Sequence, residues 1–257
     1  VETPLLCQST VTDPNIRSFT LEGHVSNGEQ RFLQASPEFA MKRLLAAGVG
    51  DIFQISKAFR LGEEGPFHNP EFSLLEWYRI NMDHRALIRE VAELVCQLLG
   101  RDGWQVWPYR ALFLDILGID PLLEAVGKND LLEVAESHIE SVPPGLDYDS
   151  VLDLLMSHCI EPAIYDWGVV FVTDYPPTQS ALARLIKVNE TRVAARFECY
   201  VDGCELANGY WEQCDVLAFK KRFKLDLEMR AQRLLPWVEL DRRLLGAHKH
   251  GLPDCAG

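Results

Sequence analysis

Two stretches of the chain gather polar and charged side chains at strand ends, where they could bind a phosphorylated ligand. The first stretch reads AFRLGEEGPFHNPEFSLLEWYR. In it Arg60 could hold a phosphate or carboxylate through two parallel hydrogen bonds. His68 could donate to a phosphate, and Phe72 offers a flat face for a purine. Taken alone, Arg60 is equally consistent with a surface ion pair to Glu63 or Glu64.

The second stretch reads RFECYVDGCELANGYWE and predicts a hairpin that could hold a cation. Asp202-Gly203 is typical of a two-residue turn, which would pair Tyr200 with Glu205. Glu198 then lies on the same face as Glu205, one diagonal step and about 7–8 Å away. Two carboxylates at this separation can share Mg²⁺ that is also bound to ATP phosphates. The alternative is an exposed acidic hairpin face.

Glu212 lies further along the second stretch, where strict alternation would place it on the wrong face. Asn208-Gly209 is a natural site for a bulge, and one extra residue there would bring Glu212 back beside Glu205. This expectation makes Glu212 a candidate for the same group of carboxylates.

A third carboxylate, Glu38, lies in the first turn after a Ser36-Pro37 helix start. Its ordinary role would be to complement the helix dipole. Together with Glu76 and Glu212, it would supply carboxylates suited to a substrate that bears two amines.

The elements that position these residues follow from periodicity and turn signals. Ser36 and Pro37 begin a helix that Gly48 ends. Strands over 51–60 and 72–79 form an antiparallel hairpin with a long loop, and Phe72, Glu76 and Tyr78 share a face of the second strand. Further expected elements are a helix at 84–100, short helices within 101–165, a buried strand at 168–173, a strand pair at 193–206 and a helix at 216–235. Strands paired through hairpins indicate an α+β fold with an antiparallel sheet flanked by helices.

Length and composition narrow the class of protein. The chain has 257 residues, enough for one domain or one domain with a small subdomain. Its net charge of −13 argues against a protein that grips a phosphate backbone. Its apolar runs are shorter than the ~20 residues that span a bilayer, so we expect no membrane association. Seven dispersed cysteines indicate reduced thiols and a cytoplasmic location.

At these motifs the chain resembles class II lysyl-tRNA synthetases, and more closely their short paralogues, the elongation factor P lysine ligases. The resemblance covers essentially the whole chain. VETP matches the end of motif 1, FR…HNPEF…LEWY matches motif 2, and RFE…ELANG…E matches the strand pair that binds metal and lysine. It implies a class II synthetase-like sheet and a catalytic domain over residues 1–257 with a helical insertion at about 101–165. The first helix of motif 1 and motif 3 are expected to lie outside the chain.

The resemblance also implies a role for each candidate residue. Arg60, Glu63 and His68 would be catalytic, with Arg60 at the substrate carboxylate and α-phosphate and His68 at the ATP tail. Asn69 and Phe72 would bind ATP, with Phe72 stacked on adenine, and Glu198 and Glu205 would hold Mg²⁺. The amino-acid pocket would consist of Ser36, Glu38, Glu76, Tyr78, Asn208 and Glu212.

Finer features favour the ligase branch. Residues 36–38 read SPE, as in the ligases, where the synthetases usually have APE, and LEWYR and PDCAG are ligase-like too. One departure is that the second position after Arg60 is Gly62, so that the motif 2 acid falls on Glu63.

The implied activity is ATP-dependent activation of (R)-β-lysine or lysine, followed by transfer to a lysine of elongation factor P. A homodimer is implied, and tRNA is not an expected partner. Two alternatives stay open: a lysyl-tRNA synthetase core that charges tRNA, and a non-catalytic synthetase paralogue.

Overall fold

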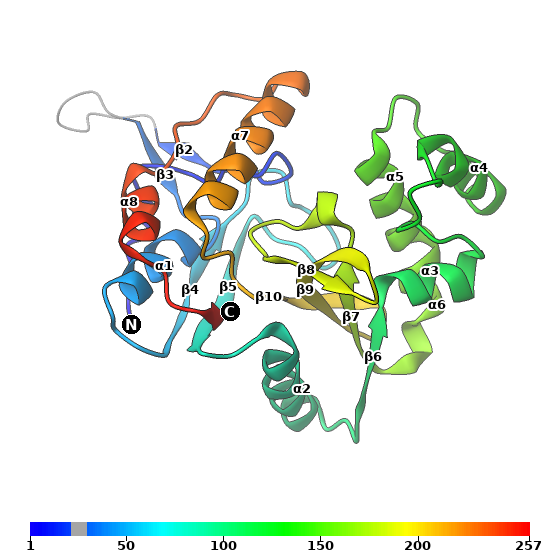
Figure 1. Cartoon of the computed structure of the whole chain (residues 1–257), viewed down its shortest axis with the longest axis horizontal. Helices are drawn as coiled ribbons and strands as arrows, with labels where there is room; N and C mark the ends of the chain where they lie inside the picture. The colour runs from blue at the N-terminus through cyan, green and yellow to red at the C-terminus, as the bar shows by residue number, and fades with distance from the viewer. Residues whose placement is uncertain (22–29) are drawn as a thin grey trace. The chain divides into compact units, whose positions relative to one another are not determined.

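The computed structural model describes residues 1–21 and 30–257, which form two compact units (Figure 1). The first unit joins Val1–Met82 to Glu212–Gly257, and the second is the continuous stretch Asp83–Trp211. The expected single domain with a helical insertion stays a prediction.

The first unit is built on the expected hairpin. β4 and β5 pair antiparallel from Ile52 opposite Tyr78 to Phe59 opposite Glu71, and β11 extends this sheet beside β5. A small second sheet has the order β1-β3-β2. The elements are β1 (Leu6–Cys7), β2 (Thr20–Leu21), β3 (Arg31–Leu33), α1 (Glu38–Ala46), β4 (Ile52–Phe59), β5 (Glu71–Ile80), α7 (Val216–Gln232), α8 (Arg242–His250) and β11 (Cys255–Ala256).

Alternation along the hairpin decides which side chains can reach a ligand. On β5, Glu76 and Tyr78 lie on the more buried face, as predicted. On β4 the predicted alternation is also confirmed, but its inward face is the more polar one. Gln54 is buried, whereas Phe53 is 63% exposed and Ile55 is 69% exposed. The inward face of this hairpin therefore offers polar groups to a site.

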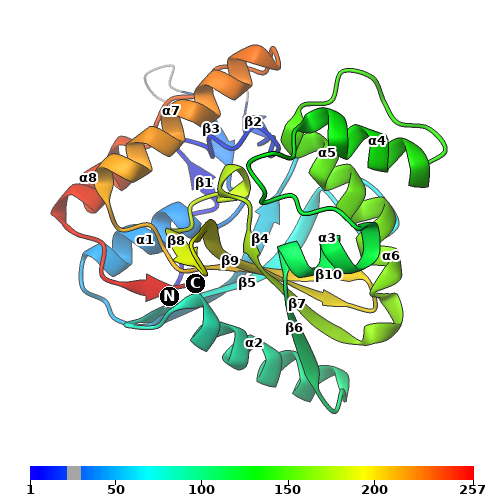
Figure 2. The same cartoon turned by 45° about the vertical axis from the view of Figure 1, so that its right-hand side comes forward.

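Helix α1 ends at Gly48 as its sequence predicts, but it begins one residue later than predicted, with Pro37 rather than Ser36 at the N-cap position. The hydroxyl oxygen of Ser36 accepts a hydrogen bond from the backbone N–H of Glu38 at 3.0 Å, which satisfies a donor left open at a helix start. Gly48 has a φ of +83°, the left-handed conformation that commonly follows a helix. Helices α7 and α8 both pack against α1 (Figure 2).

The second unit contains a five-stranded sheet with the order β10-β9-β7-β6, and β8 pairs with β9. Every pair is antiparallel except β6–β7, which is parallel. The predicted buried strand is confirmed, because all of β7 is buried. The strands are β6 (Trp104–Pro108), β7 (Val169–Tyr175), β8 (Leu185–Val188), β9 (Thr191–Val201) and β10 (Cys204–Tyr210).

Helices occupy most of the segment between β6 and β7, as the sequence predicts. They pack on β7 through a core that includes Leu112, Leu152 and Val170. The prediction of helices within 101–165 is wrong for β6, a mostly exposed edge strand that ends at Pro108. The helices are α2 (His84–Leu99), α3 (Tyr109–Leu117), α4 (Lys128–His138), α5 (Tyr148–Leu155), a π-helical turn (Met156–Ile160), α6 (Glu161–Ala163), and 3₁₀ turns at Tyr165–Trp167 and Pro177–Gln179.

The β9–β10 hairpin turns at Asp202-Gly203, and Tyr200 pairs with Glu205 as predicted. Both turn residues have positive φ, +48° and +73°, as a two-residue turn of this kind requires. The predicted bulge position is wrong. The register shifts between Glu205 and Ala207, so the extra residue is Leu206 and not Asn208-Gly209.

Gly209 has a different use, which explains why the bulge does not form there. It lies directly opposite Phe197, and a Cβ at Gly209 would come within 2.3 Å of the Phe197 ring. The glycine lets the aromatic ring lie against the backbone of β10. The shift at Leu206 brings Asn208 opposite Glu198.

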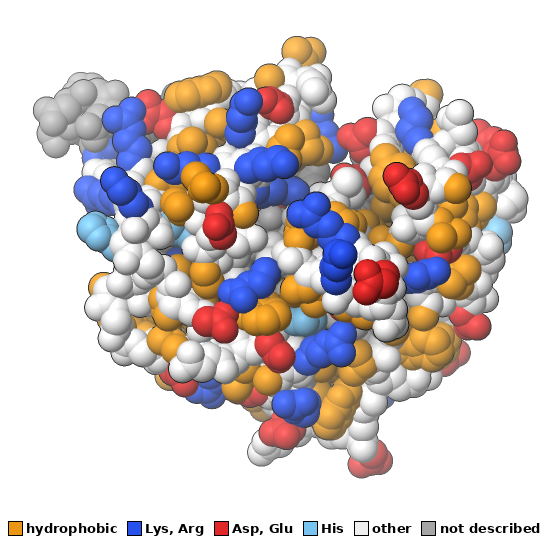
Figure 3. Space-filling model, in the orientation of Figure 1, with side chains coloured by type: hydrophobic (Ala, Val, Ile, Leu, Met, Phe, Trp, Pro, Cys, Tyr) orange, Lys and Arg blue, Asp and Glu red, His pale blue; other side chains and the backbone are white. Residues whose placement is uncertain are grey.

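The surface of the first unit carries a basic helix despite the acidic composition. Lys220, Lys221 and Lys224 are exposed on α7, and Lys and Arg side chains gather around this helix on the face drawn in Figure 3. In the part of the chain that the structure describes, every helix is too short or too polar to cross a membrane.

Gly209→Ala is expected to lower the free energy of unfolding by about 1–3 kcal/mol, the usual cost of overpacking a filled interior. The reason is the contact with the Phe197 ring, which is buried. Urea denaturation would measure the change. Gly103→Ala is the matched control, because no atom lies within 4 Å of its added Cβ. Equal unfolding free energies for the two variants would contradict the assigned role of Gly209.

Candidate active site

Glu76 is the centre of a polar cluster in the first unit. Its Oε2 accepts a hydrogen bond from Ser36 Oγ at 2.7 Å, and its Oε1 accepts one from Tyr78 Oη at 2.9 Å. Ser36 reaches it from the start of α1, and Tyr78 does so because it lies two residues along the same face of β5. Three of the predicted pocket residues are therefore brought together by direct contacts.

Lys42 joins two more of the predicted carboxylates. Its Nζ lies 2.6 Å from Glu38 Oε1 and 2.6 Å from Glu212 Oε2. Only 1% of the side-chain surface of Lys42 and of Glu212 is exposed. The backbone N–H of Glu212 donates to the carbonyl of Cys255 at 3.0 Å, which ties this segment to β11. The sequence analysis missed Lys42, although its spacing of four residues from Glu38 was the available signal.

Burial changes the protonation equilibria of this cluster. It raises the pKa of Glu76 to about 7, with the charge of Glu38 adding to the effect and Ser36, Tyr78 and Lys42 opposing it. Burial likewise raises the pKa of Glu212, against the attraction of Lys42. Burial by itself would lower the pKa of Lys42, but Glu212 and Glu38 outweigh it and raise that pKa. The lysine is therefore an ammonium ion, and the carboxylates compete for the charge it provides.

Arg60 and Phe72 lie close together at the loop end of the β4–β5 hairpin. The guanidinium carbon of Arg60 is 5.1 Å from the centre of the Phe72 ring. Arg60 Nη1 also lies 3.6 Å from Glu63 Oε2, with both side chains about one-third exposed. The ion pair to Glu63, one of the two alternatives for Arg60, is thus present, and it leaves the guanidinium accessible from the surface.

His68 and Asn69 lie in the loop between β4 and β5 and are exposed. The loop is held by a short antiparallel bridge between Gly65 and His68, in which their backbone N–H and C=O groups pair. The structure therefore assembles Arg60, Glu63 and Phe72, while His68 and Asn69 are presented to the surface.

Glu198 is the centre of a second cluster, in the second unit. Its Oε2 accepts hydrogen bonds from Tyr175 Oη and Tyr200 Oη, each at 2.5 Å. Its Oε1 accepts from Arg196 and from Asn208 Nδ2, the latter at 3.2 Å. The predicted convergence of Glu198 and Glu205 on one face is confirmed, because Asn208 Nδ2 also reaches Glu205 Oε1 at 3.5 Å.

Arg196 was missed by the sequence analysis, and it provides the positive charge that pairs with Glu198 in this second cluster. Its guanidinium carbon lies 4.4 Å from the centre of the Tyr175 ring and 5.7 Å from that of Tyr210, while Nη1 donates to the carbonyl of Gln179 at 2.7 Å. Because Arg196 and Glu198 are two residues apart on β9, they share a face. The arginine pairs with Glu198 and fixes its side chain in place.

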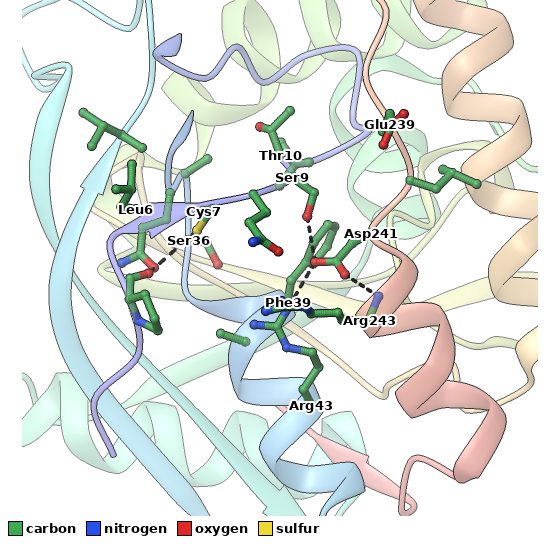
Figure 4. Close-up of a pocket in the computed structure, with 18 of the residues that line it drawn as sticks. Leu6, Cys7, Ser9, Thr10, Ser36, Phe39, Arg43, Glu239, Asp241 and Arg243 are labelled. Atoms are coloured by element: carbon green, nitrogen blue, oxygen red, sulfur yellow. Dashed lines mark hydrogen bonds and ion pairs between the residues drawn. The ribbon is translucent and has the colours of Figure 1, made fainter. Parts of the chain in front are cut away.

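A cavity of about 340 Å³ lies in the first unit between β1, α1 and the start of α8 (Figure 4). Asp241 is the polar centre of the cavity. Its Oδ2 accepts a hydrogen bond from Ser9 Oγ at 2.8 Å and lies 3.1 Å from Arg43 Nη1. Among the described residues that line it, Ser36 is the one predicted ligand residue. Because Ser36 also donates to Glu76, the cavity adjoins the carboxylate cluster, and no pattern in the sequence indicated it.

Comparison with known proteins identifies the family. Residues 1–257 match the family described as tRNA synthetases class II (D, K and N). Proteins named elongation factor P–(R)-beta-lysine ligase are 42% identical in Haemophilus influenzae (strain PittGG), 42% in Vibrio atlanticus and 43% in Pectobacterium carotovorum. Each comparison covers 100% of this chain and 80% of the relative. The resemblance drawn from the motifs is thereby confirmed, and the chain belongs to the class II tRNA synthetase family as an ATP-dependent ligase.

Proposed function

We propose that this enzyme activates lysine or (R)-β-lysine with ATP and transfers the aminoacyl group to a lysine side chain of elongation factor P. The observation that carries the proposal is the cluster of Glu38, Glu76 and Glu212, in which a single lysine, Lys42, contacts Glu38 and Glu212 and acts on Glu76 only through its charge. The names of the relatives supply the acceptor protein and the β-amino acid.

The buried carboxylates suit an amino acid with two ammonium groups. Buried charge is stable only when it is paired, and one lysine leaves part of this charge for a ligand. We propose Glu38, Glu76 and Glu212 as partners of the ammonium groups, with Ser36 and Tyr78 orienting Glu76. Asn208 is proposed for the same pocket on the resemblance alone. An uncharged analogue would leave the carboxylates unpaired and would be rejected.

For ATP, we propose that Phe72 stacks on adenine, while Arg60 holds the substrate carboxylate and the α-phosphate. The accessible guanidinium of Arg60 beside the Phe72 ring is consistent with both roles. His68 and Asn69, exposed in the adjoining loop, would bind the phosphate tail and the nucleotide. Glu63 would keep Arg60 oriented until the ligand arrives.

Glu198 and Glu205 are proposed as Mg²⁺ ligands, and their oxygens suit this hard cation. The described residues contain no group of three or more His, Cys, Asp or Glu side chains placed to hold a metal. The two carboxylates would therefore need further oxygens, such as those of ATP. Asn208 contacts both glutamates, so its movement would open a coordination position on Glu205 Oε1 and leave Glu198 Oε1 with Arg196 as its remaining donor. Bound Mg²⁺ would offset the negative charge of the phosphates.

The reaction needs no nucleophile from the protein. The carboxylate of the amino acid attacks the α-phosphorus of ATP, and pyrophosphate leaves with the electrons of the broken P–O bond. The lysine amine of the acceptor protein then attacks the activated carbonyl and expels AMP. The enzyme contributes alignment and positive charge, the latter from Arg60, against the charge that develops.

Transfer to protein is favoured over tRNA charging by the relatives' names and by the net charge of −13. We also propose a homodimer and a cytoplasmic location, as the family resemblance implies. The exposed lysines of α7 mean that the acidic composition does not by itself decide which surface docks the acceptor.

The complete protein is expected to catalyse exchange of pyrophosphate into ATP only when lysine or (R)-β-lysine is present. With labelled amino acid, elongation factor P should become labelled and tRNA should not, because the acceptor amine replaces the ribose hydroxyl of a synthetase reaction. Labelling of tRNA alone would establish the synthetase alternative. Absence of exchange with both amino acids would establish a non-catalytic paralogue.

Glu76→Gln and Glu212→Gln are each expected to lower kcat/KM for the amino acid at least tenfold while leaving KM for ATP within about twofold. The reason is the loss of a charge that pairs with an ammonium group. Pyrophosphate exchange at varied amino acid and varied ATP measures both constants. Glu93→Gln, an exposed acid on α2, is the control and should change neither. Equal losses for the two ligands would contradict the pocket assignment.

Glu205→Gln is expected to raise the Mg²⁺ concentration needed for half-maximal exchange about tenfold, since one anionic oxygen ligand is lost. A titration with Mg²⁺ at saturating amino acid measures this. Glu190→Gln, with a side chain that is 94% exposed, is the matched control. An unchanged Mg²⁺ requirement in Glu205→Gln would remove this residue from the proposed cation site.

A further inference from the structure

Lys42 is a cation enclosed by groups that the proposed function assigns to the substrate. Its Nζ contacts Glu38 on its own helix and Glu212 from the segment before α7, each at 2.6 Å. We propose that Lys42 is a positioning residue that sets the net charge of the amino-acid pocket, so that the pocket complements an amino acid with two ammonium groups. This inference rests on the proposed function and deepens it.

The charge of the buried set supports this role. Three carboxylates and one ammonium leave a net charge of −2 when all are ionised. Lysine and β-lysine each carry two ammonium groups, which would neutralise the set, while their single carboxylate is assigned to Arg60. Without Lys42 the same pocket would hold one uncompensated negative charge in the presence of substrate.

The geometry places Lys42 where it can act on all three acids. It lies one turn from Glu38 on α1, and this spacing brings the two side chains together. Its contact with Glu212 fixes a second element, whose backbone is bonded to β11. Its charge also reaches Glu76 and opposes the rise in the pKa of that group. One side chain thus links both predicted ammonium-binding segments.

A purely structural role accounts poorly for this arrangement. Buried ion pairs can often be replaced by apolar side chains of similar size with no loss of stability. A helix that needed only packing at this position would be served by such a side chain. The presence of a buried ammonium between two proposed ligand groups is explained when the ligand itself is charged.

The other ionisable groups around Glu38, Glu76 and Glu212 have pKa values far from that of Glu76. Burial, followed by the charge of Lys42, lowers the pKa of His248 on α8 to about 4. Burial, followed by the charge of Glu212, raises the pKa of Cys255 on β11. Burial and the charge of Glu76 raise the pKa of Tyr78 on β5 well above its ordinary value. Near neutral pH the cluster therefore changes charge through its carboxylates.

The sign of the pH effect follows from these contacts. Glu76 must be ionised to accept an ammonium group, so kcat/KM for the amino acid should rise with pH through its pKa of about 7, and Glu212, whose pKa burial also raises, should add to this rise. Lys42 lowers the pKa of Glu76 and Glu38 raises it. Removal of Lys42 should move the rise to higher pH, and removal of the Glu38 charge should move it to lower pH.

The test is pyrophosphate exchange with lysine at saturating ATP, followed from about pH 6 to pH 9. We expect Lys42→Met to move the rise in kcat/KM upward by about one pH unit and to lower kcat/KM about tenfold at pH 7, with KM for ATP within twofold. Lys42→Arg keeps the charge and should leave the rise where it is. Glu38→Gln should move it downward.

An unmoved rise in Lys42→Met, with only a lower melting temperature, would show a structural role and overturn the inference. If Lys42→Met does not fold, the other two variants decide. The charge effect would be refuted if Lys42→Arg moved the rise in kcat/KM as far as is expected for Lys42→Met. It would also be refuted if Glu38→Gln did not move the rise to lower pH. Absence of exchange in the unmodified enzyme is a different result, because it would refute the proposed function itself.

Discussion

Burial of carboxylates without full compensation is the constraint on which the first unit depends. A carboxylate removed from water is stable only beside a cation, beside hydrogen-bond donors or in its protonated form. Glu38 and Glu212 share Lys42, and Glu76 has two hydroxyl donors and no cation in direct contact among the contacts described for it. Near neutral pH, protons therefore neutralise only part of the negative charge of these carboxylates. A cationic substrate requires such remaining negative charge.

The central carboxylate of the second unit, Glu198, has a different set of partners. Glu198 receives two phenol hydroxyls, an amide and the Arg196 guanidinium, so every lone pair of its oxygens has a donor. Such a carboxylate is held in one position by its donors. A group of this kind suits a cation that must be placed accurately, whereas the partly protonated set around Lys42 suits a ligand that brings its own charge.

Rules that concern only neighbouring residues were sufficient to predict the helix, strands and turn that carry both clusters. The Ser36-Pro37 start and Gly48 end of α1, the Asp202-Gly203 turn and the alternation along β5 each depend on a few neighbouring residues. These rules placed Glu76 with Tyr78 and Glu198 with Glu205. The motifs then supplied the family, because they combine rare residue types at fixed spacings.

The residues that local rules missed are those whose roles depend on distant contacts. Lys42 looks like an ordinary helix lysine until Glu212, far along the chain, is placed beside it. Arg196 likewise gains its role from Tyr175 and from the carbonyl of Gln179. The bulge was misplaced for the same reason, because Gly209 is required by the ring of Phe197 on the neighbouring strand and Leu206 absorbs the shift instead.

These omissions share a physical cause that bears on function. The acids of a charged site are conspicuous in sequence because they belong to motifs, whereas the cations that tune them are defined by three-dimensional contacts. Lys42 contacts two of the acids proposed to bind the amino acid, and Arg196 contacts one of the acids proposed to bind the metal. The balance between each cation and its acids determines how much charge is left for a ligand. Under the proposed function, substrate choice therefore depends on Lys42 and Arg196 as much as on the acids that they contact.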